Sequence, residues 1–141
     1  MKSKVVNLVC KVGDIILIRN YQSNGVNLGQ HSFVVLSDES GQISGLSYDI
    51  ICNVMSSFKN EEQREKKLRF PGNFPISHDD SEIEHNNGAD GFIKTEQLYY
   101  FKKDKMDYMV IGCIKEEIFN LLLDFIEDEL DVPLQDITDN L

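Results

Sequence analysis

Three short runs of aliphatic and β-branched residues follow one another early in the chain, separated only by polar turns. They read VGDIILIRNY, SFVVLSDE and DIICNVM and lie within residues 12–55. Runs of this kind, bounded by Gly, Asn, Asp and Ser, are typical of β-strands. No helical pattern lies between them, so parallel strands joined by crossover helices are disfavoured. The sequence therefore predicts antiparallel strands in a sheet or small barrel, with residues 22–30 as a polar loop containing two glycines.

The rest of the chain adds further strands, one charged segment and a helix. RFPGNFPI, GFIKTEQLYYF and YMVIGCI are read as extended stretches, the first because proline disfavours α-helical backbone in the residue before it. Residues 59–67 predict an exposed short helix or loop, and residues 77–90 an acidic surface loop. Apolar residues recur at three- and four-residue steps from Ile118 to Leu130, which predicts an amphipathic C-terminal helix. We expect an acidic tail over residues 131–141, which frays after Pro133.

Length and cysteine spacing limit the organisation of the protein. A chain of 141 residues with 41% hydrophobic content suits one domain over residues 1–141, with its core within about residues 11–130. No apolar run approaches the roughly 18 residues of a membrane span, so we expect a cytoplasmic protein that does not contact membranes. Cys10, Cys52 and Cys113 lie far apart among apolar neighbours. That pattern favours reduced core thiols, and it indicates neither a metal site nor any other cofactor.

The net charge of −10 is unevenly distributed along the chain. Residues 1–76 carry nine Lys and Arg against seven Asp and Glu, whereas residues 77–141 carry five against seventeen. A polyanion could therefore still bind the first half, while the acidic second half lies elsewhere or recruits a basic partner. Net charge alone does not exclude nucleic acid.

The order of five segments resembles the MazF/PemK family, the toxin half of bacterial toxin–antitoxin pairs. The segments are KVGDI, GQHSFVVLS, NVMSS, RFPGNFPI and GFIKTEQLYYFKK, and the similarity spans about residues 11–130. The resemblance implies a mainly β fold, a small, strongly bent antiparallel SH3-like barrel with peripheral helices, one of them C-terminal. It also implies a homodimer, an endoribonuclease activity on single-stranded RNA without a metal, and a cognate antitoxin whose segment lies across the same groove.

The resemblance also suggests which residues act on RNA. Cleavage without a metal uses the RNA 2′-hydroxyl as nucleophile on the adjacent phosphate, so the enzyme must accept and donate protons and stabilise charge on the phosphate. The family's Arg at the head of its second strand and its Thr or Ser at the end of the third fall on His31 and Ser56. His31 is then the acid/base or phosphate contact, and Ser56 a hydroxyl donor. Further contacts to the RNA backbone are expected from Gln30, Ser57, Lys59 and Arg69.

Two departures from the family pattern support a second hypothesis. His31 replaces a permanently charged guanidinium with a group that ordinarily titrates near pH ~6.5, and Tyr99 stands where many relatives carry Arg. Lys66 and Lys67 could compensate for the lost charge. In the second hypothesis, the chain is a catalytically weak or inactive barrel that acts as a binding or regulatory module.

Structural roles also remain open for the candidate residues. His31 could be a hydrogen-bonded residue at the edge of a strand, and Ser56 and Ser57 could cap the following helix. The basic residues near Lys66 alternate with glutamates and could form a solvated face. HDDSEIEH, residues 78–85, is too flexible in composition to favour a metal site. Tyr99 and Phe101 share a strand face, where core packing is expected, and Gln97 is expected to be structural.

Overall fold

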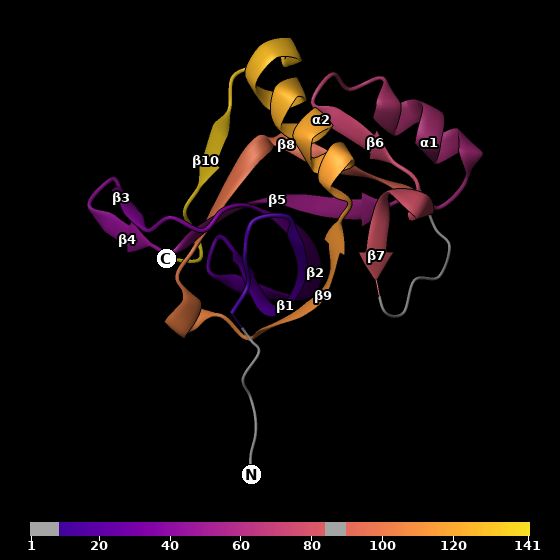
Figure 1. The fold of residues 1–141 in the computed structure, drawn as a ribbon. Helices are drawn as coiled ribbons and strands as arrows, with labels where there is room; N and C mark the ends of the chain where they lie inside the picture. The colour runs from indigo at the N-terminus through magenta and orange to yellow at the C-terminus, as the bar shows by residue number, and fades with distance from the viewer. Residues whose placement is uncertain (1–8, 84–89) are drawn as a thin grey trace.

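A computed structural model describes residues 9–83 and 90–141. The described chain is mainly β-structure with two α-helices and short helical turns (Figure 1). In chain order the elements are β1 (Asp14–Ser23), β2 (Val26–Ser37), β3 (Gly41–Ile43), β4 (Leu46–Tyr48), β5 (Ile50–Ser57), α1 (Glu61–Leu68), β6 (Asn73–Ile76), η1 (His78–Asp80), β7 (Ser81–Ile83), β8 (Gly91–Phe101), η2 (Lys103–Lys105), β9 (Tyr108–Ile114), α2 (Glu116–Asp124), the π-helical turn η3 (Phe125–Glu129) and β10 (Gln135–Ile137).

One sheet forms the body of the molecule. Its strand order is β10-β8-β5-β2-β1-β9-β7, with β6 also paired to β8, and β3 and β4 form a separate hairpin. Every pair in the main sheet is antiparallel except β10 with β8. The strands curve around the centre of the molecule, and α2 lies across the sheet (Figure 1). The predicted mainly antiparallel β fold with a C-terminal helix is thus confirmed.

The sheet buries side chains on both faces, in two hydrophobic clusters. Phe33 and Val35 of β2 belong to the first cluster, whereas Val34 between them belongs to the second. Consecutive strand residues point to opposite faces, so an unbroken apolar run serves both clusters. From α2, Phe119 and Leu122 pack into the second cluster. The helix therefore covers the face to which Val34 points, and the first cluster lies on the other face.

The predicted loop at residues 22–30 is a tight hairpin, which corrects the sequence-based expectation. β1 continues to Ser23 and pairs it with Val26, so only Asn24 and Gly25 turn. Both have positive φ, 52° and 79°. A two-residue Asn-Gly turn of this kind matches the twist of antiparallel strands. The β1–β2 hairpin thus extends well beyond the sheet core.

The charged segment forms α1, an exposed helix in which no residue is buried. Its N-cap is Asn60, whose side chain accepts a hydrogen bond from the Gln63 N–H at 2.8 Å. Glu61 and Glu62 occupy the first turn and Lys66 and Lys67 the last, which suits the helix dipole. The alternative that Ser56 or Ser57 caps this helix is wrong, because both lie within β5.

Two segments expected to be irregular form regular structure. Within residues 77–90, η1 and β7 are ordered and β7 pairs with β9, while residues 84–89 lie outside the described chain. The tail expected to fray after Pro133 instead forms β10, and that expectation was wrong. β10 adds to the free side of β8, and Ile137 packs against the first hydrophobic cluster. No helix in the described residues is long and apolar enough to cross a membrane.

Candidate functional site

His31 lies on β2, on the face of the first hydrophobic cluster. It pairs with Ile18 of β1. Phe33, two residues after His31 in β2, lies on the same face. The ring of His31 packs against Tyr21, with centroids 4.7 Å apart and planes tilted by 54°. The side chain is partly buried, and its Nδ1 atom is buried without a hydrogen-bond partner among residues 9–83 and 90–141. An unpaired buried nitrogen is costly, so this histidine is held by packing and keeps an unused polar atom.

Ser56 lies beside His31 in the register of the sheet. The pairing of β2 with β5 ends at Ser32 with Met55, and continuing this register by one step sets His31 opposite Ser56. Val54, two residues before Ser56, belongs to the same cluster as Phe33. His31 and Ser56 therefore point to the same side of two adjacent strands, and Ser56 is exposed. The structure brings together the two residues predicted to be catalytic.

Lys94 of β8 joins this face from the other side of β5. It pairs with Val54, while Ser56 pairs with Phe92. Residues that pair across strands share a face, and diagonal neighbours lie about 7–8 Å apart. Lys94 is thus a partly buried cation next to Ser56 on the candidate surface. The sequence analysis missed it.

A bulge in β8 follows Lys94 and positions a carboxylate. The β5–β8 register shifts between the Cys52–Tyr99 and Val54–Lys94 pairs. Within the shift Asn53 donates from Nδ2 to the carbonyl oxygens of Thr95 at 3.4 Å and Gln97 at 3.0 Å. Such bulges turn a side chain away from the regular alternation. Glu96 lies within this irregular stretch of β8.

Glu96 is a buried acid with a free oxygen. The residue is 7% exposed, and its Oε2 has no hydrogen-bond partner in the described chain. It packs against Gly72, where a Cβ atom would collide with the carboxylate. Gly72 in turn accepts hydrogen bonds from the Thr95 amide at 2.9 Å and hydroxyl at 2.7 Å. A buried carboxylate with an unused oxygen is a candidate proton acceptor.

Tyr99 extends the site toward the β1–β2 hairpin. Burial raises the pKa of its hydroxyl well above the ordinary value, and a hydrogen bond with Tyr21 adds to the shift. The hydroxyl donates to Oε1 of Gln97 at 3.0 Å. Its ring stacks near Phe101 at 6.3 Å with planes 11° apart, so the expected sharing of one face and core packing are confirmed. Tyr99 therefore contributes a neutral hydroxyl next to the Tyr21–His31 pair.

The other predicted RNA contacts do not gather here. Gln30 and Ser57 are exposed and each is one residue away from a site residue, hence on the opposite strand face. Lys59 precedes the N-cap of α1 and Arg69 is its C-cap. An eight-residue helix is about 12 Å long, so these two cations lie at its opposite ends. The signal that could have found Lys94 and Glu96 was the charged pair in KTEQ, inside an otherwise apolar strand.

Neither protein-family models nor curated protein sequences give a match to this chain. Among the described residues, no group of three or more His, Cys, Asp and Glu side chains could hold a metal ion. The predicted acidic cluster at residues 78–85 falls partly outside the described residues, at 84 and 85. The function is therefore argued from the geometry of His31, Ser56, Lys94 and Glu96.

Proposed function

We propose that the protein is a MazF/PemK-like endoribonuclease that cleaves single-stranded RNA by attack of the 2′-hydroxyl, without a metal. The observation that carries this proposal is the juxtaposition of His31 and Ser56 on one face of β2 and β5. In the attack, the 2′-oxygen forms a bond to phosphorus and the bond to the 5′-oxygen breaks. The products are a 2′,3′-cyclic phosphate and a 5′-hydroxyl, so one proton leaves the nucleophile and one reaches the departing oxygen.

Each of the four candidate site residues has a separate role in this reaction. Glu96 offers a buried carboxylate oxygen with no other partner, suited to accept the proton of the 2′-hydroxyl. His31 donates the proton to the departing oxygen. Lys94 and the Ser56 hydroxyl donate to the phosphate oxygens as negative charge grows on them.

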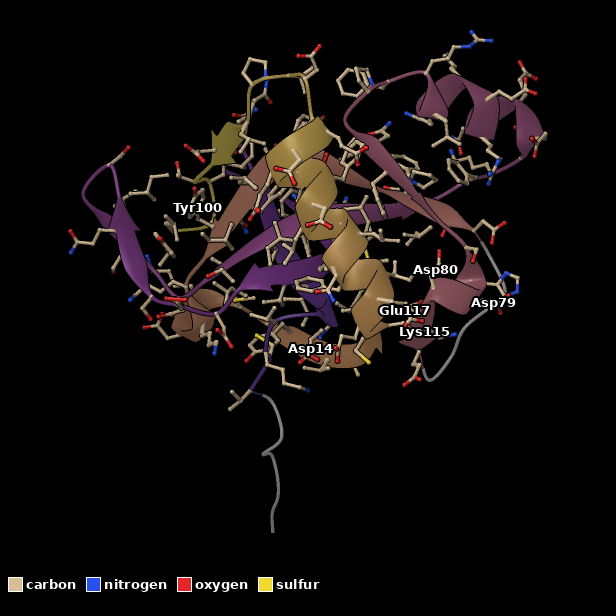
Figure 2. All side chains as sticks on the ribbon, turned by 45° about the horizontal axis from the view of Figure 1, so that its top comes forward. Asp14, Asp79, Asp80, Tyr100, Lys115 and Glu117 are labelled. Carbon is tan, nitrogen blue, oxygen red and sulfur yellow. The ribbon has the colours of Figure 1, made fainter. Side chains whose placement is uncertain are left out.

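The distribution of acidic residues is compatible with RNA on this face. Glu116 and Glu117 begin α2, which packs on the second cluster, away from the face of His31. In Figure 2, Asp79, Asp80 and Glu117 lie near one another at the start of α2, well away from Tyr100. These acidic residues of the second half of the chain thus lie away from the face of His31, which is one of the two alternatives that the charge distribution left open.

The proposal includes the family's other properties. These are a closed SH3-like barrel, a homodimer, a cytoplasmic location and a cognate antitoxin. The antitoxin would cover the same face as RNA, because that face carries the chemistry to be inhibited.

The test is cleavage of a long single-stranded RNA by the purified protein in EDTA. We expect cleavage by the wild type, and a loss of about a hundredfold or more in His31→Ala, Ser56→Ala and Lys94→Ala. Ser57→Ala is the matched control for Ser56 because its side chain points to the opposite face. His78→Ala is the control for His31. Intact RNA with wild-type protein, or equal cleavage by the site variants, would refute the proposal.

Two observations favour the binding module as a second candidate. Tyr99 presents a neutral, hydrogen-bonded hydroxyl in place of a cation, and His31 buries one ring nitrogen against Tyr21. The first feature removes a positive charge that a phosphate could contact, and the second leaves only one ring nitrogen of His31 accessible to it. Tight binding of RNA by the wild type without cleavage would support this second candidate.

A further inference from the structure

An open groove lies where three segments of the chain meet, namely the entry to β1, the β7–β9 pair and the start of α2. Its volume is about 530 Å³, which is within the range of about 300–1,000 Å³ that is typical of ligand pockets. We call it the α2 groove and define it by its lining residues, 11–14, 82, 113–117 and 119. The residues of the candidate RNA site are not among them.

Backbone hydrogen bonds hold the walls of the α2 groove together. The Gly13 amide donates to the Val35 carbonyl at 2.9 Å, and the Gly13 carbonyl accepts from the Ile114 amide at 2.9 Å. At the start of α2, the Lys115 amide donates to the Asp80 carbonyl of η1 at 3.0 Å. The groove is therefore formed before any ligand arrives, which lowers the entropic cost of binding.

The α2 groove has an apolar lining that reaches the core. Ile114 and Phe119 are buried and belong to the second hydrophobic cluster. Val12 is 40% exposed, and Cys113 is partly exposed. An aliphatic side chain that enters the groove would cover Val12 and remove apolar surface from water. The groove thus suits one apolar anchor of a partner.

The charged residues of the α2 groove leave an excess of negative charge. Lys11 and Asp14 form an ion pair with each other at 3.3 Å. Three exposed carboxylates then stand against one remaining ammonium group of the lining, that of Lys115. The three carboxylates make no ion pair within the described residues, and they belong to Glu82, Glu116 and Glu117.

The surroundings of the groove add to this negative charge. Figure 2 shows Asp79 and Asp80 near Glu117, at the start of α2. Lys115 is also the last Lys or Arg of the sequence, because residues 116–141 carry nine Asp and Glu and no basic residue. A basic partner therefore meets complementary charge at this groove, and such complementarity favours encounter and selects the partner.

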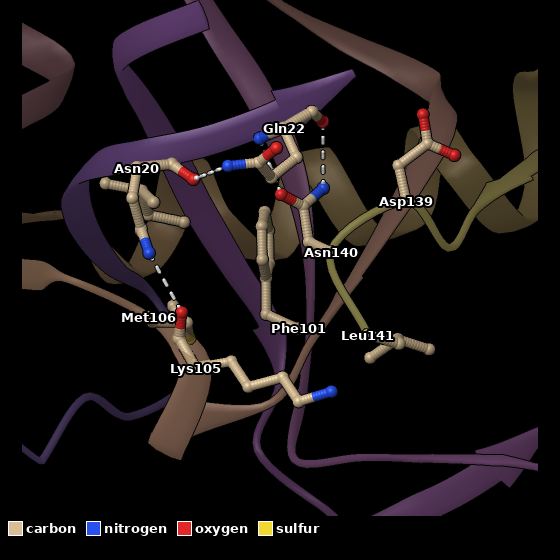
Figure 3. Close-up of a pocket in the computed structure, with 9 residues that line it drawn as sticks. Asn20, Gln22, Phe101, Lys105, Met106, Asp139, Asn140 and Leu141 are labelled. Carbon is tan, nitrogen blue, oxygen red and sulfur yellow. Dashed lines mark hydrogen bonds between the residues drawn. The ribbon is translucent and has the colours of Figure 1, made fainter. Parts of the chain in front are cut away.

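A smaller pocket of about 220 Å³, between the end of β1 and residues 139–141, lacks this charge excess. Its charged lining residues are Lys105 and Asp139, one of each sign. The Asn140 side chain accepts from the Gln22 amide at 2.8 Å and donates from Nδ2 to the Gln22 carbonyl at 3.3 Å (Figure 3). This pocket therefore does not select a basic ligand, and it serves below as the comparison site.

We propose that the α2 groove docks a basic segment of a partner protein. An aliphatic side chain of that segment enters the groove against Val12, and flanking Lys and Arg side chains contact the carboxylates of Glu82, Glu116 and Glu117. The inference goes beyond the proposed function, because it assigns a second partner to a second surface. Ile114 and Phe119 belong to the second cluster and His31 lies on the face of the first, so the basic segment and RNA use different faces of the sheet.

The test uses a fluorescein-labelled peptide with a central leucine between two Arg-Lys pairs, and a second peptide with serine in place of the leucine. Fluorescence anisotropy measures the binding of each. The groove variant is Glu116→Gln with Glu117→Gln, and its matched control is Glu61→Gln with Glu62→Gln. Both pairs are exposed and occupy the first turn of a helix, so the two variants lose the same charge from the same kind of position. Val12→Ser tests the apolar contact.

At low salt we expect the groove variant to bind the leucine peptide about fivefold more weakly than the control variant, with the difference shrinking as salt rises. Val12→Ser is expected to weaken binding of the leucine peptide about threefold and to leave the serine peptide unchanged. Equal affinities of the groove and control variants would reduce the effect to the net charge and overturn the inference. Equal binding of the two peptides by the wild type would also overturn it, as would no binding.

NMR chemical shifts locate the bound peptide on the wild-type protein. We expect the amide signals of Val12, Gly13 and Cys113 to move on addition of the leucine peptide, while that of Asn140 beside the smaller pocket stays constant. Changes centred on Asn140 or on α1 would overturn the inference.

The binding and cleavage results separate the two proposals. If the peptide binds as expected while no form cuts RNA, the groove inference holds and the nuclease proposal fails. If the wild type cuts RNA but groove and control variants bind the peptide equally, the nuclease proposal holds and the groove inference fails.

Discussion

The side-chain amide of Asn53 donates to the carbonyl oxygen of Gln97 across 3.0 Å, where the β5–β8 ladder loses its register. Asn53 is fully buried, and the bond joins two strands that each carry candidate site residues. Backbone groups freed by a bulge need new partners. This side chain supplies them, so the irregular stretch of β8 that contains Glu96 is held from the neighbouring strand.

Replacement of Asn53 by Leu is expected to destabilise the protein by about 1–3 kcal/mol, because the Thr95 and Gln97 carbonyls lose their donor inside the core. Urea unfolding followed by circular dichroism measures this. Asn120→Leu, at an exposed position of α2, is the control and is expected to change the unfolding free energy by less than about 0.5 kcal/mol. An Asn53 variant as stable as the wild type would contradict the role given to this amide.

Substitution of Gly91 by Ala is expected to disturb the site strand. An added Cβ would collide with the backbone carbonyl oxygen of Ser56, and relieving the collision would move Ser56 or cost about 1–3 kcal/mol in strain. The control is Gly45→Ala, which meets open space but has φ of +80°. It is expected to cost about 1 kcal/mol and to leave RNA cleavage unchanged. Equal cleavage by the two variants would show that Gly91 does not position Ser56.

The His78–Asp90 pair is expected to make stability depend on pH. The hydrogen bond from the His78 ring to Asp90, together with the nearby charge of Asp79, raises the pKa of His78 above its ordinary 6.5. The hydrogen bonds from the His78 amide and ring lower the pKa of Asp90 below 3.8. The histidine contribution is therefore complete below pH 6.5 and is lost as pH rises through its raised pKa. The contribution of Asp90 is complete above pH 3.8 and is lost as the pH falls through the lowered pKa of its carboxylate.

NMR titration of the His78 ring checks this prediction. In Asp90→Asn the pKa of His78 should fall toward the ordinary value, with Asp79 retaining part of the shift. The melting temperature of the same variant should be lower than that of the wild type near pH 5.5, and this difference should be smaller at pH 9. An unchanged His78 titration would mean that the 3.1 Å contact between Nδ1 and Asp90 is not formed in solution.

The three thiols are expected to react at different rates. Burial raises the pKa of Cys10 and, more strongly, of Cys52, and the thiolate is the reactive form. Cys113 is partly exposed and should be alkylated first at pH 8, as mass spectrometry of the labelled protein would show. Cys113→Ser should remove the fast phase, and urea should make the remaining thiols react together. Fast labelling of Cys52 in the folded protein would contradict its burial.

The class of fold followed from local patterns in the chain. Short β-branched runs without intervening helices predicted antiparallel strands, and the three- and four-residue spacing of residues 118–130 predicted the C-terminal helix. Those patterns record which face of an element is apolar. The Asn24-Gly25 turn was also readable, as a hairpin signal, but the surrounding polar residues led to the prediction of a loop.

The site was only partly predictable. His31 and Ser56 were expected only from the resemblance to the MazF/PemK family, and their position on one face depends on the β2–β5 register. Lys94 joined them through the regular pairing of β5 and β8, whereas Glu96 lies in the irregular stretch of β8, where Asn53 donates to the Thr95 carbonyl from 42 positions away in the chain. No local pattern encodes a partner at that separation.

The sequence by itself determined the antiparallel strands and the amphipathic helix, since each depends on the spacing of apolar and polar residues within one segment. For the charged segment that forms α1 it left a short helix and a loop open. Tertiary structure decided the strand neighbours, the irregular stretch of β8 that contains Glu96, and the ordering of residues 135–141. The acidic tail has the composition of a frayed end, yet it is ordered because the free edge of β8, Tyr100 and the hairpin turn supply partners for its backbone and side chains. Hydrogen-bond partners from distant segments are a property of the folded chain, which is why composition failed there.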